Sequence, residues 1–368
     1  MIIRLKSTNE TFWLPIYIMN DSSFQSGAYL ILLIIEFILY ILTAIIICST
    51  VRIFLKIKLF HRNMNIMKTL FLCQWFEAIM AKLVIIPFQI GVFKFCDSTQ
   101  PYVSWWSEEG SDEIIIIEKA STTVYLLIIA SFLVWHYAYS MIFGILNLGL
   151  ERIFATVLLK DYENTPRLYI PVLLICSTHV VTLVFSYLVL TNRTGFYMGT
   201  SPCFINSGLS FMMYIIVLKV NKRRRKKLED PGPGCDYSLA QQFQVKENYR
   251  ALKLAKNLLI VVLCAMSVPC ALLIMLVIGL IPSFKMILIH VMENSIYLNP
   301  IIICTVLMFS STVWRDEYLK LIPGWKRFRT ARVFKVRPKP QLTHRASTAP
   351  VEPDEGLIYF EQLKKSWQ

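Results

Sequence analysis

Seven long apolar segments divide the chain, and each is long enough to cross a membrane as a helix. A transmembrane helix needs about 20 mostly apolar residues. These segments are apolar throughout, whereas the strands of a membrane β-barrel alternate at every second residue. The predicted fold is therefore an all-α integral membrane protein whose seven-transmembrane helix bundle covers residues 28–312. The predicted spans are Ala28–Val51, Met64–Phe93, Ser121–Leu148, Leu168–Leu190, Met198–Val220, Leu258–Ile281 and Met286–Phe309.

The composition agrees with this pattern. The 368 residues are 55% hydrophobic and 17% charged, whereas a soluble domain is about 45–50% apolar and about 25% charged. This excludes a soluble enzyme, a nucleic-acid-binding domain and a disordered protein. The nine cysteines show neither a CxxC pair nor a His/Cys metal spacing, so we expect no metal and no cofactor. Met1–Ile3 is too short for the apolar core of a cleavable signal peptide, and we expect the first span to be an uncleaved anchor.

Basic residues give the orientation, because Lys and Arg gather in cytoplasmic loops. With seven spans, 30 of the 38 basic residues fall on one side. Without the weaker fifth span, the basic run Asn221–Lys227 would lie on the outer side, against this tendency. The charge distribution therefore favours seven spans. We expect an outer N-terminal tail over residues 1–27, a cytoplasmic tail over residues 313–368, contact with membrane lipids and a location in the plasma membrane. Three glycosylation sequons fall on the predicted outer side, at Asn9, Asn20 and Asn192.

Two cytoplasmic segments carry helix signals. Pro231–Gly234 is a breaker, and Ser238 with Gln241 forms a capping box. We therefore predict a helix that begins near Leu239 and continues into the sixth span. After the seventh span, Trp314 and its neighbours predict a short amphipathic helix on the inner membrane surface. Beyond about residue 338 the tail is rich in Pro, Ser and Thr, and we predict disorder.

The pair Glu151–Arg152 lies at the inner end of the third span. It resembles the acidic–Arg switch of rhodopsin-like G-protein-coupled receptors, in which a guanidinium is held by carboxylates at rest and released when helices move. The alternative is a plain anchor, since Arg at a helix end usually meets lipid headgroups.

Prolines inside two spans predict kinks, because proline removes a backbone donor. Pro269 lies within the sixth span and Pro300 within the seventh. Asn299–Pro300 resembles the start of the receptor NPxxY motif, although Ile303 replaces the tyrosine. Glu77 on the second span could face Asn299 in an internal polar network.

Charged and polar side chains inside spans are usually functional or paired. His290, Glu293 and Asn294 share one face of the seventh span and, with Asn206 and Ser207 on the fifth, could line a ligand pocket. The alternative is hydrogen bonding that only packs the helices. Other polar residues in spans are Glu36, Lys82, His136 and His179. Cys96 and Cys203 are the two cysteines placed at the oxidising outer face, where a disulfide is plausible.

Two motifs make the interpretation more specific. LERIFATVLLKDYENTPRLYIP (Leu150–Pro171) and YSLAQQFQVKENYRALK (Tyr237–Lys253) resemble the signatures of the nematode serpentine receptor class epsilon family, Sre. Gln242 stands where the resemblance leads us to expect a basic residue. The resemblance implies a chemosensory receptor that binds an external small molecule and activates a heterotrimeric G protein, in the cilium of a sensory neuron. It implies G-protein contacts from Tyr237, Phe243, Glu247, Asn248 and Arg250.

Two other functions make different demands on the sequence. A ligand-gated seven-helix channel would need the opposite topology and a polar row along one span, and the basic loops disfavour that topology. An intramembrane metal hydrolase would need several His and an Asp near one membrane face, but no predicted span contains Asp. The sequence therefore favours the receptor over an enzyme.

Overall fold

The computed structural model describes residues 1–20, 26–57, 59, 61–93, 102–103, 114–118, 121–158, 167–229, 239–278, 280 and 284–321. Its helices are α1 (Gly27–Lys56), α2 (Arg62–Cys73), α3 (Trp75–Gln89), α4 (Thr122–Val157), α5 (Tyr169–Leu190), α6 (Gly195–Glu229), α7 (Leu239–Ile278), α8 (Lys285–Tyr297), α9 (Asn299–Phe309) and α10 (Thr312–Lys320). The short strands are β1 (Ile2–Leu5), β2 (Glu10–Trp13), β3 (Ile18–Met19), β4 (Tyr102–Val103) and β5 (Ile115–Ile117).

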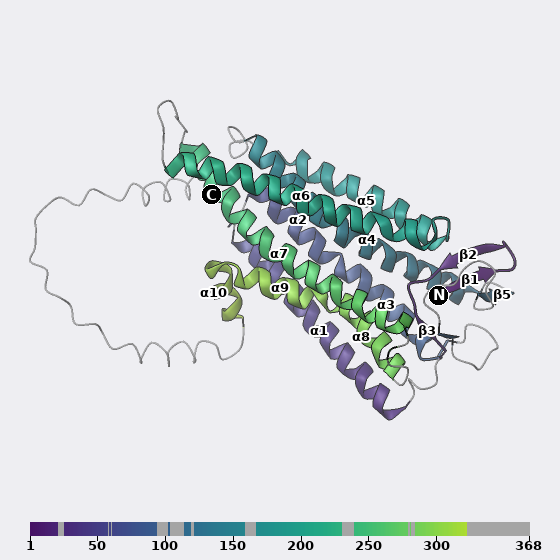
Figure 1. Ribbon diagram of the computed structural model, residues 1–368. Coiled ribbons are helices and arrows are strands. Elements are labelled where there is room, and N and C mark those ends of the chain that lie inside the picture. Colours follow the sequence, from purple (N-terminus) through teal and green to yellow (C-terminus); the bar gives the residue numbers. More distant parts are fainter. Residues whose placement is uncertain are drawn as a thin grey trace, which may run out of the picture. The chain divides into compact units, whose positions relative to one another are not determined.

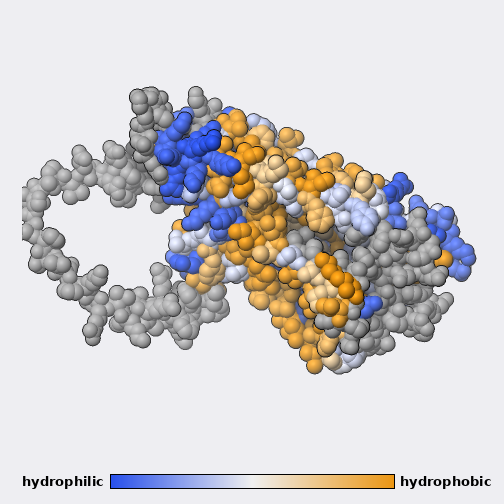
Figure 2. Space-filling model, viewed as in Figure 1, coloured by the Kyte–Doolittle hydropathy of each residue, from blue (hydrophilic) through white to orange (hydrophobic). Residues whose placement is uncertain are grey.

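The helices match the predicted spans. Within the described residues, six helical segments are long and apolar enough to cross a membrane, and α8 with α9 makes a seventh if the bent pair is one span. The second predicted span is formed by α2 and α3, which meet at Gln74. The weaker fifth span is part of α6, and its apolar portion satisfies the same criterion. Figure 2 shows the apolar side chains along the helices and a hydrophilic cluster near the end of α6.

The two prolines occupy different places in their helices. The axes of α8 and α9 differ by 42°, with the break at Leu298. Pro300 lies in the first turn of α9, where its missing N–H costs no intrahelical hydrogen bond. In contrast, α7 continues through Pro269 as one helix from Leu239 to Ile278. That helix begins at the predicted residue and continues into the sixth span without interruption.

The N-terminal segment is an ordered cap on one end of the bundle (Figure 1). β1 pairs antiparallel with β2 and parallel with β5, so that Ile3 lies between Phe12 and Ile115. The apolar side chains of these strands pack against α3 and α4, where Leu14 shares a cluster with Phe88 and Leu127. The predicted outer tail is thus a folded lid rather than a simple tail, because its apolar residues are buried.

At the opposite end of the bundle, α10 packs through one aromatic anchor. Trp314 is fully buried, and its ring centroid lies 4.9 Å from that of Phe54 on α1. The ammonium of Lys68 on α2 lies 4.8 Å from the Trp314 ring centroid, a cation–π arrangement. The short helix predicted after the seventh span is confirmed, and Trp314 fixes it to α1 and α2.

The packing of α2 on α4 depends on a glycine. A Cβ at Gly144 would lie 3.1 Å from two ring atoms of Phe71, which is tighter than an ordinary van der Waals contact, so the Phe71 ring would have to move. We expect Gly144→Ala to destabilise the bundle by about 1–3 kcal/mol, measured as a lower Tm of the purified protein in detergent. Gly208→Ala is the control, because no described atom lies within 4 Å of its added Cβ. Its expected effect is neutral or stabilising. Equal Tm values for the two variants would contradict the proposed contact.

Candidate functional site

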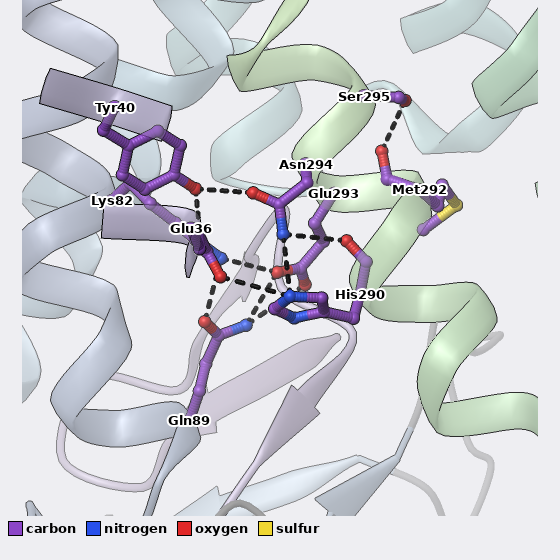
Figure 3. A network of polar contacts seen from close by, with 9 residues as sticks. All are labelled: Glu36, Tyr40, Lys82, Gln89, His290, Met292, Glu293, Asn294 and Ser295. Carbon is purple, nitrogen blue, oxygen red and sulfur yellow. Dashed lines mark hydrogen bonds and ion pairs between the residues drawn. The ribbon is translucent and has the colours of Figure 1, made fainter. Parts of the chain in front are cut away.

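A buried polar cluster joins α1, α3 and α8 near the capped end of the bundle (Figure 3). At its centre, Lys82 Nζ lies 2.7 Å from Glu293 Oε2 and donates to Gln89 Oε1 at 3.0 Å. Gln89 Nε2 in turn donates to both carboxylate oxygens of Glu293, at 3.1 and 2.9 Å. The Lys82 and Glu293 side chains are only 3% and 8% exposed. The ion pair is therefore shielded from water and supported by additional hydrogen bonds, as a buried pair requires.

We call this the outer cluster, because it lies at the end of the bundle that is predicted to face outward; its members are Glu36, Tyr40, Lys82, Gln89, His290, Glu293 and Asn294. Its second half is centred on Glu36. Its Oε2 lies 3.3 Å from His290 Nε2, and its Oε1 accepts a hydrogen bond from the Tyr40 hydroxyl. The Tyr40 oxygen also lies 2.8 Å from Asn294 Oδ1, and Asn294 Nδ2 lies 3.2 Å from His290 Nε2. Three helices that are distant in sequence thus share one hydrogen-bonded network.

The outer cluster encloses a small cavity of about 10 Å³. Glu36, Lys82, Gln89, His290 and Glu293 line it, together with apolar residues that include Ile18 of β3 and Ile289 of α8. The cavity is about the size of one water molecule. Its polar groups are therefore in direct contact rather than arranged around an open pocket.

The predicted grouping of Asn206 and Ser207 with this cluster is wrong. Asn206 donates to the carbonyl of Ile142 on α4 at 2.7 Å, and Ser207 donates to Cys203 on its own helix at 2.8 Å. The reason is that α6 packs on α4, α5 and α7, whereas the outer cluster lies between α1, α3 and α8. His290, Glu293 and Asn294 do come together as predicted.

A second polar chain connects α3, α4 and α5. His136 Nδ1 lies 2.7 Å from Glu77 Oε1, and His136 Nε2 lies 3.3 Å from His179 Nδ1. The two imidazole rings are stacked, with centroids 5.3 Å apart. Gln74 Nε2 lies 3.3 Å from His179 Nε2 at the end of the chain. Two neutral imidazoles satisfy this arrangement if His136 donates to Glu77 and accepts from His179.

Glu77 therefore contacts His136 and not, as predicted, Asn299. Glu77 lies on the side of α3 that faces α4, whereas α9 packs against α1, α7 and α10. Asn299 lies at the start of α9, and its Oδ1 has no hydrogen-bond partner among the described residues.

A third cluster lies at the opposite end of the bundle, around Arg152. Arg152 Nε and Nη2 each lie 2.5 Å from a carboxylate oxygen of Glu151, and Nη1 donates to Asn248 Oδ1 on α7 at 3.2 Å. Asn248 Nδ2 donates back to the carbonyl of Ala155 at 3.3 Å. Arg152 is only 2% exposed and Glu151 is fully buried. The guanidinium is thus held inside the bundle, which differs from an anchor that reaches lipid headgroups.

We call this the inner cluster, because it lies at the end of the bundle that is predicted to face the cytosol. It extends from α4 and α7 to two further helices. Thr156 accepts a hydrogen bond from Asn221 on α6 at 2.9 Å, and its carbonyl accepts one from Arg224 at 2.5 Å. Glu247 on α7 accepts a hydrogen bond from the backbone N–H of His61 at 2.7 Å. Burial lowers the pKa of His61 to about 4, so its imidazole is neutral at physiological pH. The inner cluster therefore links α4 to α6 and α7, and links α7 to the start of α2.

The remaining predicted residues are more dispersed. Tyr237 and Cys96 lie outside the described residues, and the predicted Cys96–Cys203 disulfide therefore stays a prediction. The Phe243 side chain is also outside what the structure describes. Arg250 is exposed on α7. Among the sequons, Asn9 is exposed in a turn, whereas Asn20 is buried and its N–H donates to Phe88. Asn192 is half-buried after α5.

Several site residues were not found from the sequence. Tyr40 and Gln89 complete the outer cluster, and Asn221 and Arg224 complete the inner one. Tyr40 lies one helical turn after Glu36, so their shared helix face was an available signal. The partners on α6 gave no such signal, because only the packing of α6 on α4 brings them to Thr156. Among the described residues, no group of three His, Cys, Asp or Glu side chains is arranged to hold a metal ion.

The long apolar helices with polar clusters between them define a membrane-embedded helical bundle of the serpentine-receptor class. The whole chain, residues 1–368, matches the family model described as Sre G protein-coupled chemoreceptor. The protein belongs to this family, whose members are receptors rather than enzymes.

Similar proteins of Caenorhabditis elegans carry the same family name. Serpentine receptor class epsilon-38 is 69% identical over 367 residues, with both chains covered completely. Serpentine receptor class epsilon-37 is 34% identical over 371 residues, which cover 100% of this chain and 99% of the relative. Serpentine receptor class epsilon-31 is 31% identical over 367 residues, with both chains covered completely.

The buried pair Lys82–Glu293 yields a stability prediction. Lys82→Met leaves Glu293 charged and buried without its cationic partner, so we expect a loss of about 3–5 kcal/mol. The double variant Lys82→Met/Glu293→Met removes both charges and should recover most of that loss. The measurement is thermal unfolding of the purified protein, analysed as a double-mutant cycle.

The control for this cycle is Lys6→Met, which removes a lysine from an exposed pair with Glu118. Exposed pairs contribute about 0–1 kcal/mol, so Tm should hardly change. Additive effects of the two changes at Lys82 and Glu293 would contradict the coupling.

Proposed function

We propose that this protein is a chemosensory receptor that binds an external small molecule at the outer cluster and activates a heterotrimeric G protein through the inner cluster. The observation that carries the proposal is the burial of Arg152, bound by Glu151 and by Asn248 of α7. Because Asn248 and Arg152 belong to different helices, an outward movement of α7 would break this contact and open the side of the guanidinium that faces α7, while Glu151 of the same helix stays bound to it. The geometry supports a resting state in which the inner face is closed.

The surroundings of Arg152 favour such a movement. A cavity of about 50 Å³ lies between α4, α6 and α7, lined by Arg152, Gly149, Met213 and Leu252 among others. Tightly packed interfaces resist small displacements, and this space leaves α6 and α7 freer to shift relative to α4. A partner helix entering the inner face would then meet Arg152, Glu247 and Asn248. Tyr237, Phe243 and Arg250 of the same segment complete the proposed G-protein contact.

At the outer cluster, the charges favour one class of ligand. Of the cluster's two carboxylates, Glu293 pairs with Lys82, whereas Glu36 faces His290, which is charged only when protonated. A ligand with a positively charged or hydrogen-bond-donating group would compensate the additional carboxylate. The cavity is small, so binding would have to separate contacts such as Lys82–Glu293 and thereby shift α3 relative to α8. A ligand changes the equilibrium between two states only by its difference in affinity for them.

The proposed orientation places the N-terminus and the strand lid outside and α10 in the cytosol. This orientation is supported by the basic residues at the end of α6 and at the start of α7, since Lys and Arg concentrate on the cytoplasmic side. We propose a plasma-membrane location, with a sensory cilium expected from the family. The channel alternative requires a polar row along one span, whereas the polar residues above bond across helices.

Glycosylation tests the orientation. We expect Asn9 to carry a glycan, because it is exposed in a turn between β1 and β2. Asn9→Gln should abolish a glycosidase-sensitive gel shift in membranes. Asn20→Gln is the matched control and should leave the shift intact, because Asn20 is buried. Protease accessibility that placed the N-terminus inside would overturn the topology and with it the receptor mechanism.

The switch role can be tested without knowing the ligand. Asn248→Ala removes the side-chain hydrogen bond that ties Arg152 of α4 to α7, so basal nucleotide exchange on a purified G protein should rise by on the order of fivefold. Adding Arg152→Ala to this variant should abolish the increase, because the guanidinium is then missing. The measurement is nucleotide exchange with receptor in phospholipid nanodiscs.

Two controls accompany the exchange assay. Asn206→Ala removes a similar side-chain hydrogen bond between α6 and α4, away from Arg152, and should leave basal exchange unchanged. Thermal unfolding of each variant separates loss of fold from loss of signalling. Full exchange by the Asn248→Ala/Arg152→Ala variant would refute the role given to Arg152.

A further inference from the structure

Two basic helix faces oppose each other where α6 ends and α7 begins. On α6, Lys219, Lys222 and Lys226 follow at spacings of three and four residues and so share one face. On α7, Lys246 and Arg250 are also one turn apart. Figure 2 shows the hydrophilic surface in this region, directly beside the apolar band of the helices.

The two faces enclose adjoining hollows. The larger has a volume of about 730 Å³ and is lined by Lys219, Lys222, Arg223, Arg225, Lys226 and Tyr249. The smaller, of about 340 Å³, is lined by Arg225 and Tyr249 again and by Lys246, Arg250, Leu228 and Gln242. Neither lining includes an acidic side chain among the described residues. We call the two hollows together the basic groove.

The basic groove has an excess of positive charge. Seven cationic side chains line it, and no ion pair among the described residues involves Lys219, Lys222 or Lys226. Like charges at this spacing repel one another, so a bound polyanion would stabilise the arrangement. The Arg225 guanidinium lies 4.5 Å from the Tyr249 ring centroid. This contact orients a side chain whose planar donors match phosphate oxygens.

The position of the basic groove indicates that the anion belongs to a lipid. On α6, the exposed apolar residues Met212 and Ile216 precede Lys219 by two turns and one turn. The same side of the helix thus changes from apolar to basic within one turn. An acyl chain along the apolar part would bring its headgroup to the lysines, at the level where membrane surfaces attract basic side chains.

We propose that the basic groove binds an anionic phospholipid with a multiply phosphorylated inositol headgroup. A serine headgroup has a single net negative charge, which is small against seven cations. Each phosphate monoester carries about −1.5 to −2 at pH 7, so a headgroup with two of them matches the groove far better. The basic groove shares Arg250 with the proposed G-protein contact, but Lys219, Lys222 and Lys226 belong neither to that contact nor to the Arg152 cluster.

The test measures lipid binding directly. Purified full-length protein is placed in phosphatidylcholine nanodiscs that contain either phosphatidylinositol bisphosphate or phosphatidylserine in an amount of equal charge. We expect preferential binding of the inositol lipid. Lys219→Gln/Lys222→Gln/Lys226→Gln should weaken it by at least about tenfold, whereas the corresponding Lys→Arg triple variant should retain it.

The matched control is Arg52→Gln/Lys227→Gln/Lys256→Gln. It removes the same charge from exposed positions that do not line the basic groove, and affinity should change by less than about twofold. An equal loss in both triple variants, or equal binding of phosphatidylserine, would overturn the proposal. It would also fail if the lysine variant bound the lipid normally but lost affinity for a G protein in phosphatidylcholine alone, because the basic groove would then be a protein contact.

Discussion

A charged side chain placed among apolar helices must find its partner inside the protein, because lipid offers no hydrogen bonds. This constraint organises the whole bundle. Lys82 is compensated by Glu293 and Arg152 by Glu151, and each pair is supported by an amide side chain, Gln89 or Asn248. The helices are therefore held in one arrangement by a few buried contacts as well as by apolar packing, which is a weaker discriminator of partners within a membrane.

The same contacts make the bundle responsive. Lys82 and Glu293 lie on α3 and α8, and Arg152 and Asn248 lie on α4 and α7. A compound that competes for one partner must therefore change the relation between two helices. A satisfied buried network is stable, but removing one partner leaves a charge whose burial is costly. In the proposed receptor, a ligand at one end and a G protein at the other would both act on such networks.

The bend between α8 and α9 lies between these two ends. Trp75 donates from Nε1 to the carbonyl of Tyr297 at 2.7 Å, directly before the break at Leu298. Pro300 follows and starts α9, which packs against α1, α7 and α10. The outer cluster thus sits on one rigid half of this span, and the α10 end of the bundle contacts the other. In the proposed topology, a movement of α8 at the ligand site would therefore be transmitted across the bend to α9, the half of the span that faces the cytosol.

The features that depend on local pattern could be predicted from the amino-acid sequence. These are the apolar spans, the helix that begins at Leu239, the short helix around Trp314 and the family signatures. Which polar groups meet depends instead on the packing of the helices in three dimensions. Glu77 pairs with His136 rather than with Asn299, and Asn206 bonds to α4 rather than joining His290. The N-terminal segment became a lid because β1 pairs with β5, far along the chain. The periodicity of a helix shows which residues share a face, but the partner of that face depends on how distant helices pack.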